Sequence, residues 1–312
     1  MKRNLLFAAL LVFASFASAA DSRTGMWSAR LDGDALYVNL VRPSPHHEYG
    51  TNNIGTNISF ASISGLTKAD VAAPAKDVQF TFSAPAGTIA FDGRFSNGLG
   101  AGNFRFTPSG AFLGEMESLG YSGFKDDELL MFALESFRPQ TIRDLRALGY
   151  TIEKKQLDEI AIFKIDANTV REYGALGYPN LPLRDLVQFR IGHIDAAFVK
   201  GIREIFGDVS AHELSQLGIL HVTPAYVREL QGAGLTSLTP HEATELKIAQ
   251  ITAAKIADYR RLGFTLTPHE LQEFGLFKVT PEFIAEARAR DGKDLTPRQL
   301  IDMKIFSRER SR

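Results

Sequence analysis

The stretch Val279-Thr280-Pro281-Glu282-Phe283-Ile284 decides the fold class, because it recurs earlier in the same chain as Val222-Thr223-Pro224-Ala225-Tyr226-Val227. Weaker copies begin at Phe137, Ile165, Ile194 and Ile251. The starts at 137, 165, 194, 222, 251 and 279 lie 28, 29, 28, 29 and 28 residues apart. A partial, slightly longer copy begins near Phe106, which gives about seven units. Self-similarity at such a period indicates a stacked repeat architecture.

Each copy carries the signals of two helices. The first helix opens with Thr-Pro, in which Thr is a natural N-cap and Pro occupies the first helical position. It ends at a glycine, as in the segment 145–150, where glycine adopts the left-handed conformation without a steric penalty. The second helix opens with a capping box, Leu266-Thr267-Pro268-His269-Glu270, which recurs at 238–242.

A single unit of this size buries too few apolar side chains to offset the entropy of ordering its backbone. Neighbouring units must therefore share their apolar faces, which predicts an all-α solenoid of two-helix repeats over residues 107–312. Phe206-Gly207-Asp208 shifts the helix-ending glycine by one position, and Asp291-Gly292 replaces the usual ending in the last unit. We expect a local change in the superhelix at the first and an atypical end cap at the second.

The repeat text, with Val279-Thr280-Pro281-Glu282-Phe283-Ile284 and Leu145-Arg146-Ala147-Leu148-Gly149-Tyr150, resembles helical repeats of uncharacterised bacterial envelope proteins. It is also similar to repeats appended to some membrane metallopeptidases related to β-lactam sensors. The resemblance covers about residues 106–312 and implies an architecture rather than an activity. This chain lacks the zinc motif and the membrane helices of those peptidases, so peptidase function does not carry over.

The region before the repeats alternates polar and apolar residues with a period of two, which is typical of strands. Trp27–Leu31 and Leu36–Val41 predict a hairpin, and we expect the stretch Pro43–Asn57 to be a long loop. Three further strands are expected, the second with a bulge near Gly93; they are Asp77–Phe82, Thr88–Phe95 and Gly102–Phe106. The predicted fold is therefore α+β, with a small antiparallel β domain over residues 20–106 in front of the solenoid. The sheet would have one apolar face that needs a cover.

The first residues have the pattern of a signal peptide. Lys2 and Arg3 precede an uncharged run from Leu5 to Ala17, and Ala17-Ser18-Ala19 supplies the small residues of a cleavage site. The run is shorter than the roughly 18 apolar residues of a membrane span. We predict a signal peptide over residues 1–19, cleaved after Ala19, and a periplasmic or secreted protein. The chain has no cysteine, which excludes lipoprotein-type attachment and a disulfide framework.

Composition excludes some partners. Of the 312 residues, 45% are hydrophobic and 23% charged, which is the balance of a folded protein, and the net charge is -1. No global basic field exists to attract nucleic acid. The sequence predicts no nucleic-acid partner and no membrane span once the signal is removed.

Three His-Glu pairs raise the question of a metalloprotease: His212-Glu213, His241-Glu242 and His269-Glu270. The zinc motif requires a second histidine four positions after the first. Gln216, Glu245 and Glu273 occupy those positions. Helix capping explains each glutamate instead, because each lies at the third position of a second helix.

Other candidates also have simpler explanations. His46-His47-Glu48 could coordinate a metal, although two adjacent side chains rarely converge on one ion, and a solvated loop is favoured. Gly98–Gly102 lies between two strands, which favours a hairpin or bulge over a phosphate loop. The aromatic residue after the helix-ending glycine is expected to pack on the helix end rather than line a ligand surface; it recurs as Tyr121, Tyr150, Tyr178 and Phe264.

The sequence thus predicts no catalytic, cofactor-binding or metal-binding residue and no cofactor. The leading hypothesis is an exported, non-enzymatic scaffold for protein–protein interaction or regulation, whose repeats bind a protein or peptide of the cell envelope. Two alternatives remain open. One is a metal-dependent or ligand-binding function of the β domain, with His46, His47 and Glu48 as its residues. The other is a structural spacer of the envelope.

Overall fold

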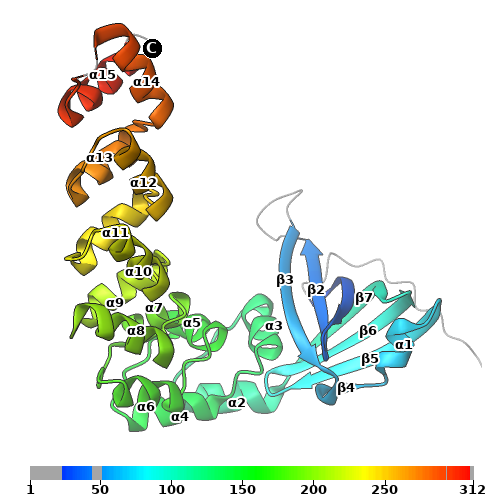
Figure 1. The fold of residues 1–312 in the computed structure, drawn as a ribbon. Helices are drawn as coiled ribbons and strands as arrows, with labels where there is room; N and C mark the ends of the chain where they lie inside the picture. Colours follow the sequence, from blue (N-terminus) through cyan, green and yellow to red (C-terminus); the bar gives the residue numbers. More distant parts are fainter. Residues whose placement is uncertain (1–22, 44–50, 293, 310–312) are drawn as a thin grey trace, which may run out of the picture. The chain divides into compact units, whose positions relative to one another are not determined.

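The computed structural model describes residues 23–43, 51–292 and 294–309 (Figure 1). A curled antiparallel sheet is followed by helices, which confirms the α+β fold class. The chain forms two compact units. The first runs to Arg143 and includes Glu153–Ala161, whereas the second comprises Asp144–Ile152 and everything from Ile162 onward. The helical segments before Arg143 are therefore part of the same compact unit as the sheet. The domain boundary at residue 106 stays a prediction.

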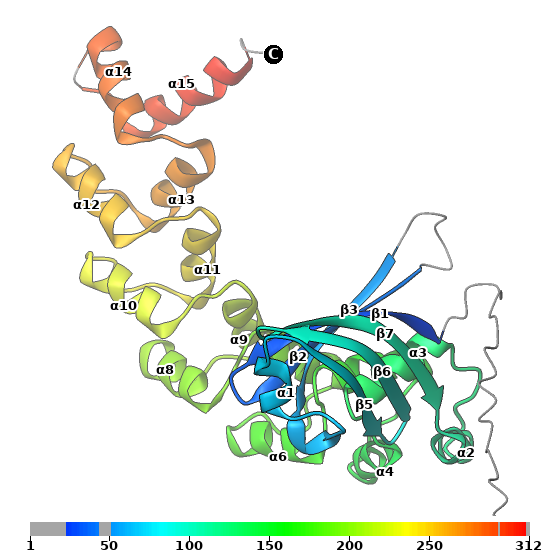
Figure 2. The same ribbon diagram turned by 90° about the vertical axis from the view of Figure 1, so that its right-hand side faces the viewer.

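The sheet of the first unit has seven strands in the order β3-β2-β1-β7-β6-β5-β4, all antiparallel to their neighbours (Figure 2). The predicted hairpin of β1 and β2 is present, with Asp32 paired to Ala35 across Gly33 and Asp34. The strands are β1 Thr24–Asp32, β2 Ala35–Pro43, β3 Thr51–Ser59, β4 Ile63–Ser64, β5 Lys76–Ala84, β6 Gly87–Ser96 and β7 Leu99–Pro108.

The expected loop over Pro43–Asn57 is wrong for its second part. Thr51–Ser59 is strand β3, which pairs with β2 from Thr51 opposite Pro43 to Ser59 opposite Ala35. Ile54, Thr56 and Ile58 alternate with exposed residues, so β3 has the strand period. Asn53, Gly55 and Asn57 give β3 a loop-like composition, and they lie on the solvent side of this edge strand.

The expected bulge near Gly93 is also wrong. Pairing runs without interruption from Phe91 opposite Phe104, through Gly93 opposite Gly102, to Phe95 opposite Gly100. Gly93 therefore faces the core, where a Cβ would lie 2.9 Å from the Trp27 ring and 2.3 Å from a β7 carbonyl. Glycine is required there because the buried Trp27 packs over the strand.

The apolar face of the sheet is rich in aromatic side chains. The Trp27 ring stands edge-on to Phe80 at a centroid distance of 5.4 Å and to Phe91 at 6.0 Å, and Phe80 stacks on Phe91 at 4.5 Å. Two helices that contact β5, β6 and β7 supply the predicted cover: α1 Lys68–Ala72 and α3 Asp126–Leu134. They contribute the fully buried side chains of Val71 and Phe132.

The remaining helices follow in pairs. They are α2 Gly110–Ser118, α4 Pro139–Ala147, α5 Leu157–Ile162, α6 Ala167–Ala175, α7 Leu183–Ile191, α8 Ala196–Phe206, α9 Ala211–Ile219, α10 Pro224–Gly232, α11 Pro240–Ile248, α12 Ala253–Arg261, α13 Pro268–Phe277, α14 Pro281–Asp291 and α15 Pro297–Glu309. Helix α2 is capped by Ser109, and Thr107-Pro108 ends β7 instead of opening this helix as Thr-Pro does at α10 and α14.

Within the second unit, the helices form two rows (Figure 1). In the second-helix row α7, α9, α11, α13 and α15 contact one another in succession, and in the first-helix row α8 contacts α10, which contacts α12. This arrangement is the predicted solenoid of two-helix repeats. The predicted Thr-Pro caps are confirmed at α10, α11, α13 and α14, where the Thr hydroxyl accepts a backbone N–H and Pro begins the helix.

Candidate interaction surface

Each second helix of the solenoid ends in the same way. From α5 to α13, a residue one or two positions after the second helix is left-handed, with φ between 50° and 57°, and none of these residues is glycine. We call them the turn row: Lys164, His193, His221, Gln250 and Lys278. They are 29, 28, 29 and 28 residues apart, which is the period of the sequence copies. All are exposed.

Hydrogen bonds close these helix ends in the Schellman pattern. The N–H of Val279 donates to the carbonyl of Phe274 at 2.8 Å, and that of Val222 donates to Leu217 at the same distance. In this motif an apolar contact joins the residue after the left-handed turn residue to the residue four positions before that turn residue. Both residues are buried in each case.

Two residues before each turn stands an exposed aliphatic side chain. We call this set the aliphatic row: Ile162, Ile191, Ile219, Ile248 and Leu276. Their exposed fractions are 48%, 43%, 40%, 55% and 48%. The residues two positions earlier, such as Leu217 and Phe274, are fully buried. The aliphatic row therefore lies on the outer face of the second-helix row and takes no part in the core.

Two further rows lie on the same face, since residues separated by three, four or seven positions line up on a helix. The basic row is Arg184, His212, His241, His269 and Arg298, all exposed. The acid–amide row, one turn further along each helix, is Gln188, Gln216, Glu245, Glu273 and Asp302. The two rows interact: His241 Nε2 lies 3.3 Å from Glu245 Oε1, His269 Nε2 lies 3.9 Å from Glu273 Oε2, and Arg298 Nε lies 3.3 Å from Asp302 Oδ1.

The three His-Glu pairs are thus explained as predicted. Glu213, Glu242 and Glu270 each close a capping box with Ser210, Thr239 and Thr267. The hydroxyl and N–H of the capping residue lower the pKa of Glu213. Among the residues that the structure describes, no group of three or more His, Asp or Glu side chains is arranged to hold a metal ion. His46, His47 and Glu48 lie outside those residues.

The glycine-rich segment is a hairpin, as expected. Asn97 and Gly98 form its turn, both with positive φ, and Leu99 begins strand β7. Gly100 leaves room for the Phe95 ring, because a Cβ there would lie 2.4 Å from that ring. The segment therefore serves packing.

The aromatic residues after the helix-ending glycines pack against their units, as predicted. Tyr121, Tyr178 and Phe264 are buried. Tyr178 also donates its hydroxyl to the carbonyl of Val209 at 3.0 Å, and Tyr150 donates to Leu181 at 2.8 Å. These bonds tie the end of a first helix to the segment that leads into a second helix.

A longer period is superimposed on the repeat. A groove of about 550 Å³ between α6 and α8 is lined by Ala175, Ala196 and Arg203, and a groove of about 460 Å³ between α10 and α12 is lined by Gly232, Ala253 and Arg260. Corresponding residues are 57 apart, which equals two units of 28 and 29. Arg203 closes its groove by donating to the carbonyl of Leu176 at 2.7 Å, where a cation stabilises the helix end.

The same double period governs the position three before each turn. It alternates between a small residue (Ala161, Gly218, Gly275) and a cation (Arg190, Lys247), and Lys304 continues the series at the equivalent position of α15. Each cation lies over a side chain of the first helix in its own unit: Lys247 is 4.7 Å from the centre of the Tyr226 ring, and Lys304 is 4.3 Å from that of Phe283. Such contacts fix the two helices of a unit together.

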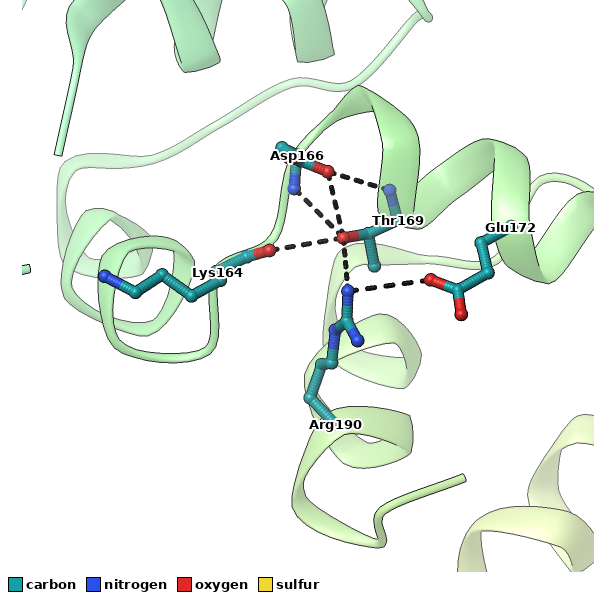
Figure 3. Close-up of polar contacts among 5 residues, drawn as sticks. All are labelled: Lys164, Asp166, Thr169, Glu172 and Arg190. Carbon is teal, nitrogen blue, oxygen red and sulfur yellow. Dashed lines mark hydrogen bonds and ion pairs between the residues drawn. The ribbon is translucent and has the colours of Figure 1, made fainter. Parts of the chain in front are cut away.

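Arg190 lies 5.9 Å from the centre of the Tyr173 ring and also joins a partly buried polar cluster, which Figure 3 shows. The Thr169 side chain is 1% exposed, and its hydroxyl accepts from Arg190 Nη2 at 2.8 Å. Asp166 Oδ1 at 3.0 Å and the Lys164 carbonyl at 3.2 Å are acceptors for the hydroxyl proton. Arg190 also lies 3.7 Å from Glu172 Oε2. The cluster links the turn after α5, the start of α6 and the end of α7.

Thr169→Val tests the importance of this cluster. Valine keeps the shape but removes the acceptor for Arg190, so we expect a loss of about 2 kcal/mol in the free energy of unfolding, measured with urea. Thr244→Val is the control, because the hydroxyl of Thr244, also buried, makes one bond within its own helix, to the Pro240 carbonyl at 2.9 Å. Equal losses in the two variants would contradict the importance of the cluster.

Two tyrosines connect successive units and predict an alkaline instability. Tyr259 donates to the Val279 carbonyl and Tyr226 to the Ile251 carbonyl, both at 2.9 Å. Burial raises the pKa of each to about 12. Because the folded state keeps the proton that the unfolded chain loses near pH 10, stability falls as pH rises from about 10 to 12.

Tyr259→Phe should lower stability by about 1 kcal/mol at pH 7 by removing the bond to Val279. It should also remove about 3 kcal/mol of the decline between pH 10 and 12, because each pKa unit corresponds to about 1.4 kcal/mol. Unfolding curves of both proteins across this range measure the difference. An unchanged alkaline slope in the variant would be inconsistent with a buried Tyr259 hydroxyl.

Comparison with models of protein families, with curated proteins and with solved structures finds no match to this chain. The resemblance to envelope repeats therefore stays a prediction. No helix among the described segments is both long and apolar enough to cross a membrane.

The aliphatic row was not found from the sequence, although a signal exists. Every repeat copy carries Leu or Ile two positions before its turn, including Leu134 in the first copy. Apolar residues at helical spacing usually face the core, so the sequence alone does not separate this exposed column from the buried one.

Proposed function

We propose that this chain is an exported, non-enzymatic protein whose helical repeats bind a partner protein or peptide. The aliphatic row carries the proposal: five large apolar side chains, each between 40% and 55% exposed, recur at one position of successive units. Single exposed apolar residues are ordinary, whereas a contiguous exposed set is typical of an interaction site. Stacked repeats present such sets along an extended surface.

Export is supported by the signal-peptide pattern of residues 1–19. A spacer in the envelope would need stacked units but no apolar row on its outer face. The row therefore favours a binding role over a purely mechanical one.

Photocrosslinking in the producing cell tests the proposal with the full chain. A photoreactive amino acid replaces Gln216, which is exposed beside the aliphatic row; in a second strain it replaces Leu99, which is 67% exposed on the sheet. We expect discrete protein adducts from the Gln216 position in the exported fraction. Adducts from the Leu99 position alone, or from neither, would contradict binding by the repeats.

A further inference from the structure

We infer that the aliphatic row and the turn row together bind one kind of partner: an extended acidic peptide segment with an aliphatic residue at every third position. This inference rests on the proposed function and adds the face used and the chemistry of the partner. It follows from the left-handed backbone of the turn row, the spacing of the repeats and the hydrogen-bond donors that the turn row presents.

The aliphatic row is not required for folding. The Schellman contacts of the helix ends are made by other residues, such as Phe274 and Val279, both buried. Leu276 lies between them in sequence yet is 48% exposed. A polar residue at this half-exposed position would cost the fold little, so its aliphatic character in every repeat points to a further role.

The turn row is conformationally costly. Left-handed backbone is unfavourable for residues with a Cβ, and glycine is the usual occupant of this position. The first helices of the same units do end in glycine, with φ near 90° at Gly149, Gly177 and Gly263. The second helices instead place Lys, His, His, Gln and Lys there. Side chains retained at a strained position point to a role for those side chains.

All five side chains of the turn row can donate hydrogen bonds, and none is acidic. The acid–amide row on the other side of the aliphatic row is already occupied, since Glu245 and Glu273 lie against His241, His269 and Arg298. In the described part of the chain, His193, His221 and Lys278 form no ion pair. A partner lying on the aliphatic row therefore meets donors on its turn-row side, and carboxylates are the matching groups.

The spacing of the units favours an extended chain. Packed helices stand about 8–10 Å apart, so the aliphatic side chains of successive units have about this separation. A polyproline II chain advances about 3.1 Å per residue with three residues per turn, and thus presents one face every 9 Å or so. A straight helix would lose contact with a row that twists from unit to unit, whereas an extended chain follows it.

Fluorescence anisotropy with the purified full chain tests the inference. The probe is a labelled peptide of repeated Leu-Asp-Pro triplets, compared with Leu-Lys-Pro and Ser-Asp-Pro peptides of equal length. We expect the first to bind at least about tenfold more tightly than either of the others. Equal or tighter binding of the Leu-Lys-Pro peptide, or of a helical peptide of the same composition, would overturn the inference.

Variants then locate the site. The combined change Ile191→Ser, Ile219→Ser and Ile248→Ser should weaken binding at least about tenfold, whereas Leu148→Ser, at an aliphatic residue 42% exposed on a first helix, should leave it unchanged. His221→Gly and Lys278→Gly should raise the melting temperature while weakening binding. Higher stability with unchanged binding would assign the turn row no part in recognition.

These results separate the inference from the proposed function. If no peptide binds while crosslinks from the Gln216 position persist, the partner chemistry is wrong and the scaffold role stands. If the crosslinks also fail, both are wrong.

Discussion

Replacing Asp127 with alanine is expected to destabilise the first unit by about 3 kcal/mol. Asp127 forms an ion pair with Arg42, which is 3% exposed, and also accepts a hydrogen bond from Asn52 Nδ2 at 3.2 Å. The variant leaves the buried guanidinium without this carboxylate. The Asp127 side chain is itself 41% exposed, but removing the partner of a buried charge costs more than an exposed pair contributes. Urea unfolding followed by tryptophan fluorescence measures the loss, since the single Trp27 lies in this unit.

Asp126→Ala is the matched control. Asp126 also lies in the first turn of α3, so both variants lose the same interaction with the helix dipole. Its partner Arg23, at 3.0 Å, has a side chain that is 50% exposed, and an exposed pair contributes about 1 kcal/mol or less. The double variant Arg42→Met with Asp127→Leu should recover most of the stability, because it removes the buried charge together with its partner. Similar losses at Asp126 and Asp127 would show that burial of Arg42 does not set the cost.

This pair also shows what the sequence could not supply. Arg42 ends a strand, Asn52 begins β3 and Asp127 begins α3, and no local pattern relates them. The repeats were predictable because their signals are local: a capping residue, a proline and a glycine at fixed offsets within about 28 residues. Because these signals are local, the left-handed residues of the turn row recur at the predicted period of 28 or 29 residues. Strand β3 was missed because its residues are those of a loop unless the partner strand is known.

The candidate surface illustrates the same limit. The sequence shows that Ile191 and Ile219 recur, but exposure depends on which side of the helix faces the next unit. That side is set by Phe189 and Leu217, which lie two positions earlier and are fully buried. The capping glutamates were predicted because a capping box is complete within four residues. The double period of 57 residues is visible in the sequence as the alternation of 28 and 29. Its structural reason is visible only in the neighbours that pack against Gly218 and Gly275.

Gly275→Ala should separate the last units from the rest of the solenoid. A Cβ on Gly275 would lie 2.2 Å from the carbonyl oxygen of Ala249 and 2.8 Å from its Cβ. The clash involves backbone at the end of α11, so helix α13 must move away from its neighbour. Overpacking of this kind costs about 1–3 kcal/mol or more, and we expect about 3 kcal/mol at this site.

Because each unit of a repeat protein is stabilised by its neighbours, the loss should appear as lower cooperativity rather than as uniform destabilisation. We expect α13, α14 and α15 to exchange their amide hydrogens faster in Gly275→Ala, while α7 and α9 keep their protection. Gly232→Ala is the control, since no atom lies within 4 Å of its Cβ position, and alanine in place of this helical glycine should add about 0.5–1 kcal/mol. If Gly275→Ala weakened protection equally from α7 to α15, the units would fold as one globule, and the one-dimensional stack on which the aliphatic row depends would be wrong.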